Sequence, residues 1–226
     1  MRWFSIIVVL CAATAVASAA PGSLQGKVIC LDPGHPSENG SGARGKKISE
    51  QRANWLVACK LKTLLQARGA RVVMTKTKEQ EQVSNRRRAE IANAAGAALM
   101  VRLHCDSAGG PGLAVYYPDR AGKVKGVAGP SRQVIAASAR AARAMYPVII
   151  KALVGKVKAK GLRTDAATYI GGRQGALTGS IYSRVPVVLV EMVTLSHAGD
   201  DAFIASDAGQ TTMAKALAAG IAAAVK

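Results

Sequence analysis

Short apolar runs alternate with amphipathic helical patterns along the chain, and this alternation most limits the folds open to it. We expect strands at residues 27–32, 71–75, 97–103, 113–117 and 186–191, and helices at 51–68, 85–95, 131–160 and 210–225. Strands interleaved with helices build layered α/β domains around a mainly parallel sheet. The prediction is a single α/β domain over residues 24–226, with a mostly parallel central sheet flanked by helices on both faces.

Local signals support several of these boundaries. Gly69 follows the apolar periodicity of the first helix, where a helix C-cap belongs, and Ser84 is positioned to N-cap the second. Pro147 lies inside the helical pattern at 131–160, so we expect it to kink or break that helix.

The first residues have the pattern of an export signal. Arg2 gives a positive start, residues 3–16 are almost wholly apolar, and Ala17-Ser18-Ala19 is a small-x-small cleavage site. We therefore predict a signal peptide at residues 1–19 and an exported protein, in the periplasm or the cell wall, with no transmembrane segment after cleavage. The alternative is an uncleaved anchor, because the apolar run is close to the length of a spanning helix.

The chain is strongly basic, with a formal net charge of +18. Export makes a specific nucleic-acid partner unexpected, although such a charge binds nucleic acid non-specifically at low salt. In an exported protein the charge favours anionic envelope surfaces such as lipid headgroups and the carboxylates of the cell-wall polymer. The alternative is a solvated basic surface that only keeps the protein soluble.

Three cysteines remain after the predicted cleavage: Cys30, Cys59 and Cys105. An odd number permits at most one internal disulfide, and the sequence does not say which pair would form it. We expect buried free thiols.

Histidines and glutamates gather at the predicted strand ends. His35 follows the first strand, His104 follows the third, Glu191 ends the last strand, and Glu50 stands at the start of the first helix. Ligands of open α/β sheets bind beyond the carboxyl ends of the strands, so we expect these four side chains to lie together. A catalytic zinc takes three protein ligands, commonly two His and one Glu, and a second carboxylate nearby accepts the proton of water.

Five stretches carry a family resemblance: Val28-Ile-Cys-Leu-Asp-Pro-Gly-His35, Ser49-Glu50, Arg88-x-x-x-Ala92-Asn93, Arg102-Leu-His104-Cys-Asp106 and Val188-Leu-Val-Glu191-Met. They resemble the zinc-dependent N-acetylmuramoyl-L-alanine amidases of the type-3 family, in order and over nearly the whole chain after residue 19. The resemblance implies that His35, Glu50 and His104 ligate Zn²⁺ and that Glu191 is the catalytic carboxylate.

The resemblance also implies a reaction: hydrolysis of the amide between N-acetylmuramic acid and L-alanine, with peptidoglycan as partner. Two alternatives stay open, a zinc peptidase acting on the stem peptide and a wall-binding module without turnover. No regulatory protein partner is identified by the sequence.

The chain departs from the family at two places. Residues 193–197 read Val-Thr-Leu-Ser-His where the family often has Gly-Phe-Leu-Ser-Asn, and Arg102 stands where it often has Ser. Arg102 shares a strand face with His104, so it is a candidate for binding a peptide carboxylate. The alternative is a salt bridge to Glu50 or Asp106. The long helical insertion that covers the zinc in some members is not evident, and we expect an open site.

Two other motifs compete for a functional role. Residues 40–45 satisfy the G-x-G-x-x-G pattern of dinucleotide sites, but they do not follow directly on a strand, and we expect a glycine loop over the site instead. Cys105 beside His104 suggests a cysteine hydrolase with His35 as base. Neighbouring residues of a strand point to opposite faces, which argues against that pairing.

Overall fold

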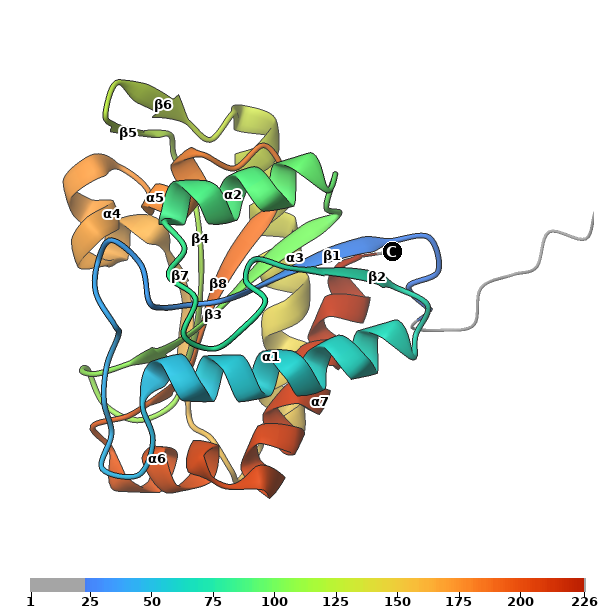
Figure 1. The fold of residues 1–226 in the computed structure, drawn as a ribbon, viewed down its shortest axis with the longest axis vertical. Coiled ribbons are helices and arrows are strands. Elements are labelled where there is room, and N and C mark those ends of the chain that lie inside the picture. The colour runs from blue at the N-terminus through green and yellow to red at the C-terminus, as the bar shows by residue number, and fades with distance from the viewer. Residues whose placement is uncertain (1–22, 226) are drawn as a thin grey trace, which may run out of the picture.

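The computed structural model describes residues 23–225, and its centre is a six-stranded sheet of order β2-β1-β3-β8-β4-β7 (Figure 1). Only the β4–β8 pair is antiparallel, so the expected mostly parallel α/β sheet is confirmed. A separate hairpin is formed by β5 (Gly122–Val124) and β6 (Val127–Gly129). The strands of the main sheet are β1 (Val28–Pro33), β2 (Arg71–Met74), β3 (Leu99–Asp106), β4 (Leu113–Tyr117), β7 (Ala159–Thr164) and β8 (Val187–Thr194).

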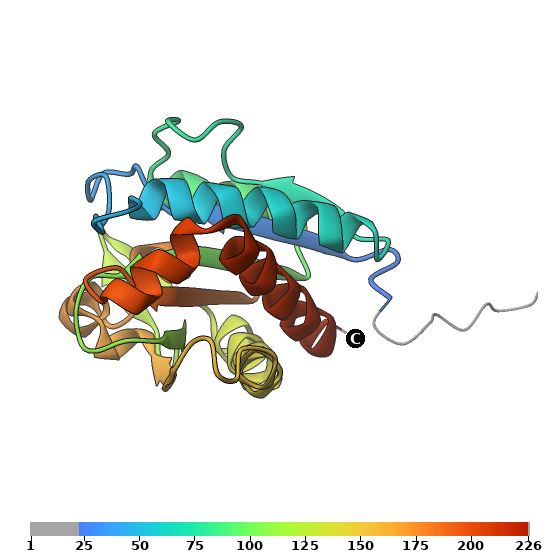
Figure 2. The same cartoon turned by 90° about the horizontal axis from the view of Figure 1, so that it is seen from below.

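Helices cover both faces of this sheet, as expected. On one face α7 (Asp207–Ala224) packs between α1 (Glu50–Gln66) and α3 (Arg132–Ala152) (Figure 2). The other face is covered by α2 (Asn85–Ala94) and α5 (Thr178–Ile181), with α4 (Tyr169–Gln174) beside them. A short 3₁₀ turn at Asp165–Ala167 precedes α4, and α6 (Ala198–Ala205) follows β8.

The two faces of the sheet differ in chemistry. Leu31, Leu103 and Val190 point to the side of α1, α3 and α7, where they belong to the main hydrophobic core. Successive strand residues point to opposite faces. Arg102 and Glu191 therefore face the other side, under α2 and α5. The apolar core covers one face, and polar groups gather on the opposite face near the carboxyl ends of β1, β3 and β8.

The expected end of the helix at 131–160 was wrong. The helix α3 ends at Ala152, and residues 159–164 form β7, which pairs in parallel with β4. Pro147 does not break α3, which continues through it for another turn. Pro147 lies on the exposed face of the helix, where water can bond the carbonyl that loses its N–H partner. The hairpin β5–β6 and the helices α4, α5 and α6 were not predicted.

The predicted signal peptide at 1–19 lies outside the described residues. None of the helices within residues 23–225 is long and apolar enough to cross a membrane. The expected free thiols are confirmed for the three described cysteines: Cys30 and Cys105 are buried, and Cys59 is half-buried.

Candidate metal centre

The turn after β1 positions His35. The residue has a φ of 59°, and its Nδ1 lies 3.0 Å from the carbonyl oxygen of Gly40. The buried ammonium of Lys76 donates to the backbone carbonyl of His35. A side chain on Gly34 would place its Cβ 2.3 Å from Cε1 of His104, so glycine at this position lets the imidazole of His104 pack against the backbone.

Glu50 opens α1, whose N-cap is Ser49. Its Oε2 accepts a hydrogen bond of 2.6 Å from the amide of Ala43, and its Oε1 accepts one of 3.1 Å from the amide of Cys105. The same Oε1 lies 2.9 Å from Nδ1 of His104 and 3.4 Å from Nε2 of His35. One carboxylate oxygen thus stands between both imidazoles.

His35, Glu50 and His104 together have the form of a metal site. The two ring centroids are 5.1 Å apart, and a candidate donor atom of each residue lies within 4.8 Å of the others. Nε2 of His104 is buried without a hydrogen-bond partner among the described residues. Buried polar atoms normally have a partner. Two imidazoles and one carboxylate are the donor set of a zinc site of the His₂Glu type, which the residues therefore fit.

The protonation states suit metal binding. Burial raises the pKa of Glu50, but the hydrogen bond to His104, the charges of the two imidazoles and the Ala43 amide outweigh it and lower the pKa to about 2. Burial lowers the pKa of His104, against the opposing effect of Glu50. An ionised carboxylate and a neutral imidazole are the forms that coordinate metals.

Glu191 lies beside this cluster. It pairs with His104 in the parallel register of β3 and β8, and its Oε2 is buried without a partner among the described residues. Burial raises the pKa of Glu191 well above its ordinary value, and the charges of Glu50 and Asp106 raise it further. Glu191, His35 and His104 line one cavity of about 250 Å³. The structure therefore brings together all four residues that the strand-end pattern singled out.

Arg102 also lines this cavity, but its partners differ from those expected. Its Nε donates to Oδ2 of Asp32 at 2.8 Å and its Nη2 to Oδ1 of Asn85 at 2.5 Å, so it pairs with neither Glu50 nor Asp106. Arg88 donates to the other Asp32 oxygen at 2.6 Å. The buried carboxylate of Asp32 therefore pairs with two guanidinium groups. This cluster of three side chains has a net positive charge at the wall of the cavity.

The two competing motifs have structural explanations. Gly42 has a φ of 86°, and a Cβ there would lie 2.6 Å from Oε2 of Glu50, so the glycine-rich loop packs closely on the metal cluster. The Cys105 thiol points to the core side, with its Sγ 3.6 Å from Oδ1 of Asn54. Burial raises its pKa well above the ordinary value, and Glu50 and Glu191 add to the effect, which makes the thiol a poor nucleophile.

Sequence reasoning missed part of the cavity wall. Asn85 contributes from the start of α2, and Thr168, Ile170 and Leu177 contribute from the segment around α4 and α5. Asn85 directly follows the predicted N-cap Ser84 and could have been suspected. Residues 165–181 carry neither a clear helical nor a clear strand period, so no signal pointed to them.

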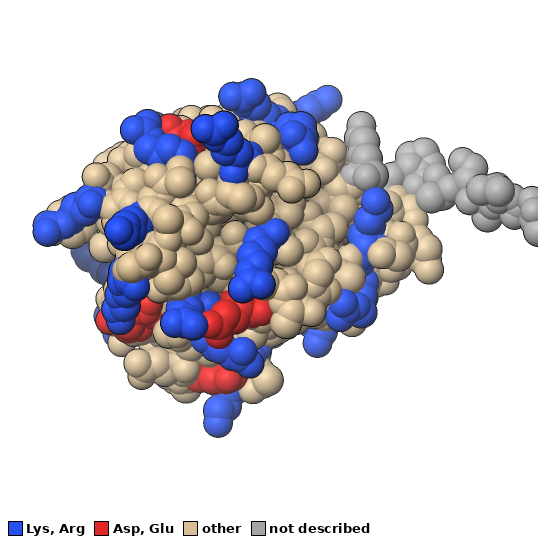
Figure 3. All heavy atoms as spheres, turned by 90° about the horizontal axis from the view of Figure 1, so that it is seen from above, with Lys and Arg blue, Asp and Glu red and all other residues tan. Residues whose placement is uncertain are grey.

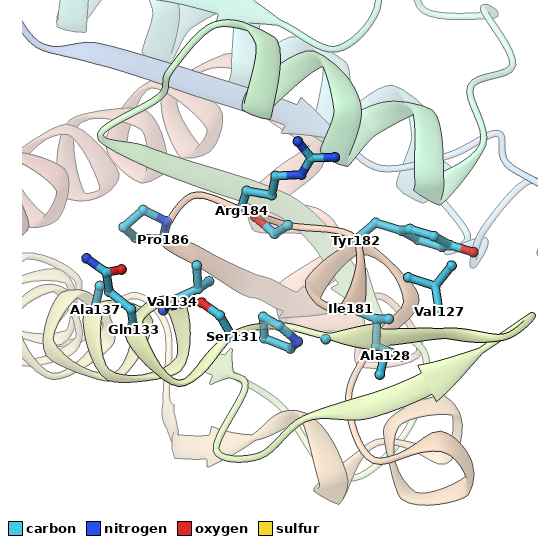
Figure 4. Close-up of a pocket in the computed structure, with 13 residues that line it drawn as sticks. Val127, Ala128, Ser131, Gln133, Val134, Ala137, Ile181, Tyr182, Arg184 and Pro186 are labelled. Carbon is cyan, nitrogen blue, oxygen red and sulfur yellow. Dashed lines mark hydrogen bonds between the residues drawn. The ribbon is translucent and has the colours of Figure 1, made fainter.

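A larger pocket of about 480 Å³ lies elsewhere, between the β5–β6 hairpin and the start of α3 (Figure 4). Tyr182 and Val127 stand at one end of it, and Gln133 and Ala137 at the other. Neither Glu191 nor any of the three residues of the metal cluster lines it.

Comparisons with known proteins identify the family of the chain. A family model described as N-acetylmuramoyl-L-alanine amidase matches residues 29–223. An N-acetylmuramoyl-L-alanine amidase of Mycobacterium tuberculosis is 27% identical in an alignment 245 residues long, gaps included. The alignment covers 95% of this chain and 94% of that protein. Among solved structures, an N-acetylmuramyl-L-alanine amidase of Mycobacterium smegmatis superposes with a TM-score of 0.74 at 22% identity, covering 90% of this chain and 98% of that one. The corresponding enzyme of Mycobacterium abscessus gives a TM-score of 0.73 at 23% identity, with 89% and 100% covered. The chain belongs to the Amidase_3 family of N-acetylmuramoyl-L-alanine amidases.

Proposed function

We propose that this protein is a zinc-dependent amidase of the cell wall, which hydrolyses the amide between N-acetylmuramic acid and L-alanine in peptidoglycan. The catalytic domain in this proposal spans residues 24–226. The single observation that carries it is the cluster of His35, Glu50 and His104, whose two histidines share a cavity with Glu191. Family membership supplies the reaction class.

His35, Glu50 and His104 are proposed to hold the metal. Bound Zn²⁺ supplies Lewis acidity, which polarises an amide carbonyl and makes water acidic enough to attack near neutral pH. Hydrogen bonds from the amides of Ala43 and Cys105 orient the two carboxylate oxygens of Glu50. Such outer hydrogen bonds fix the orientation of a ligand.

Glu191 is the proposed general base and acid. It takes a proton from the attacking water and returns it to the departing amine of L-alanine. Its raised pKa helps the group to hold the proton between the two transfers, and a cation bound beside it would favour the ionised form that first accepts the proton. Its place beside His104 in the sheet lets the rigid strands β3 and β8 set its position.

We propose that Arg102 interacts with the substrate through its positive charge. Asp32 neutralises only one of the two positive charges of Arg88 and Arg102. Arg102 lines the cavity, so the remaining charge acts on negative charge that develops on the substrate there.

Export belongs to the same proposal, because peptidoglycan lies outside the cytoplasmic membrane. It is supported by the sequence pattern of residues 1–19, a positive start, an apolar stretch and a small-x-small cleavage site. The protein would then work in the periplasm or the cell wall.

Digestion of purified sacculi tests the proposed reaction. The purified protein is expected to contain one zinc per chain and to release free peptides that begin with alanine, while the glycan keeps its lactyl groups. Mass spectrometry of the products separates the alternatives. Shortened stem peptides would indicate a peptidase, and sacculus binding without any product would indicate a wall-binding module.

A further inference from the structure

A second cavity lies next to the reaction cavity. It has a volume of about 390 Å³ and shares two wall residues, Asn39 and Ile170, with the cavity that contains His35 and Glu191. Tyr182 lines both this second cavity and the pocket of Figure 4. A substrate bound at the metal cluster can therefore extend into this neighbouring cavity, which we call the side cavity.

Two cations line the side cavity, Arg86 from the first turn of α2 and Lys125 from the β5–β6 turn. The one acidic group in its wall is Glu38. Oε2 of Glu38 accepts a hydrogen bond of 2.8 Å from the amide of Asn85, at the start of α2. Helix N-termini carry partial positive charge, which offsets that of a carboxylate bonded there. The side cavity is thus left with a net attraction for anions.

Arg86 lines the side cavity, and its contacts with neighbouring residues leave it able to bind a ligand. Its guanidinium lies 5.4 Å from the centre of the Tyr182 ring, and its Nε donates to Glu90 at 2.8 Å. Both partners of this ion pair are exposed, with 65% and 40% of their side chains accessible. Exposed pairs contribute little, so Arg86 can turn to a ligand at small cost.

Lys125 projects from a tight turn. The hairpin joins Val124 to Val127 through Lys125 and Gly126, whose φ values are 47° and 80°. Positive φ at both central residues is the geometry of a type I′ turn, which holds the hairpin in one shape. Among the described residues, no carboxylate pairs with Lys125 within salt-bridge distance.

We infer that the side cavity binds a carboxylate of the peptide arm of the substrate, through Arg86 and Lys125. This inference rests on the proposed function and names the substrate feature that the enzyme recognises beyond the amide it cleaves. The carboxyl group of muramic acid is already consumed in that amide, so the sugar arm offers only neutral groups. Free carboxylates remain on the peptide arm alone.

The charge of the surrounding surface also favours binding of the peptide arm. The face over α2, β5 and β6 shows many basic and few acidic side chains (Figure 3). Such a field attracts the anionic arm of a substrate toward the side cavity. Arg86 and Lys125 then select the carboxylate at short range, because hydrogen bonds to charged groups are stronger than neutral ones.

The test compares two soluble N-acetylmuramoyl peptides, one with free peptide carboxylates and one with the same carboxylates amidated. Four variants of the full chain are needed: Arg86→Gln and Lys125→Asn in the side cavity, and Arg87→Gln and Lys123→Gln as matched controls. Arg87 and Lys123 are exposed cations of the same elements that do not line the side cavity. Asparagine suits the turn at position 125, because Asn-Gly favours a type I′ hairpin.

We expect Arg86→Gln and Lys125→Asn each to raise KM for the free-carboxylate substrate by about tenfold, with the change in KM and not in kcat. This rise should be missing with the amidated substrate and in both control variants, and it should shrink at high salt. Isothermal titration of the uncleaved substrate on a Glu191→Gln background should show the same loss in affinity.

Three results would overturn the inference: an unchanged KM, an equal rise for both substrates, or an equal rise in the control variants. If the unsubstituted enzyme cleaves neither substrate while sacculi also remain intact, the proposed function itself fails. The two failures are therefore distinguishable.

Discussion

Glu191 and His104 are register partners on the adjacent parallel strands β8 and β3, and both line the same cavity. Each carries a buried polar atom without a partner among the described residues, Oε2 of Glu191 and Nε2 of His104. Buried polar atoms normally have a partner, and we propose that a bound ion and a reacting molecule supply these contacts. The backbone of the sheet therefore sets the spacing between the proposed base and a proposed ligand.

Replacement of the base is predicted to separate chemistry from metal binding. Glu191→Gln should lower kcat by about 10²–10⁴-fold, the usual contribution of a general acid–base group. Zinc content should stay at one ion per chain, because Glu191 is not among the three clustered ligands. Sacculus digestion and metal analysis of the same preparation measure both quantities. Glu81→Gln, which alters a carboxylate that does not line the cavity, is the control, and a fully active Glu191→Gln enzyme would remove the base assignment.

Loss of a ligand should instead abolish metal binding and activity together. His35→Ala removes one of the three donors, so the purified variant should contain little zinc and release no peptide. In the unsubstituted protein, a chelator should abolish activity, and added zinc should restore it and raise Tm, because a ligand of the folded state stabilises that state. Activity that survives the chelator but is lost on thiol alkylation would favour Cys105 as nucleophile.

The candidate site could be anticipated from the sequence because its residues follow predictable strands. An apolar run such as 28–31 marks a buried strand, and parallel strands bring their carboxyl ends to one edge. His35, His104 and Glu191 needed only this rule to be grouped. The glycines at 34 and 42 also carried information, since both allow close packing against the cluster.

The remaining parts depend on contacts that no local pattern encodes. The strand at 159–164 was not predicted: its first two residues fell in the predicted helix and the other four were left unassigned, because its strand character comes from pairing with β4. The partner of Arg102 was misjudged for a similar reason. Asp32 lies on β1, and only the register of β1 against β3 brings Asp32 opposite Arg102.

Gly34→Ala is predicted to disturb the metal site through sterics alone. The added Cβ would stand 2.3 Å from Cε1 of His104, so the imidazole must shift. We expect zinc affinity to fall by about 10–100-fold, as for other changes that misorient a ligand. Competition with a chromogenic chelator measures this affinity. Gly199→Ala serves as control, because its nearest contact, the side chain of His197, is 3.3 Å away.

Asp32→Asn is predicted to destabilise the fold. Asp32 is fully buried between Arg88 and Arg102 and accepts a further hydrogen bond of 2.6 Å from Thr75. Its loss leaves two buried guanidinium groups without a counter-charge, which typically costs about 3–5 kcal/mol. Urea unfolding at pH 7 measures the difference. The control is Asp207→Asn, which breaks a pair whose Asp side chain is 84% exposed and should change the free energy of unfolding by less than about 1 kcal/mol.

The pH dependence of the same variant tests the cause of that loss. Burial would raise the pKa of Asp32, but Arg88 and Arg102 outweigh it and hold the pKa well below its usual range. A group whose pKa is lower in the folded state stabilises the fold above its unfolded pKa, and this contribution disappears as the pH falls toward the folded value. The unfolded pKa of Asp is about 3.9. The stability difference between the unsubstituted protein and Asp32→Asn should therefore be largest near neutral pH and shrink below about pH 4. A difference that stays constant from pH 7 to pH 3 would show that packing, and not the charge of Asp32, stabilises the two arginines.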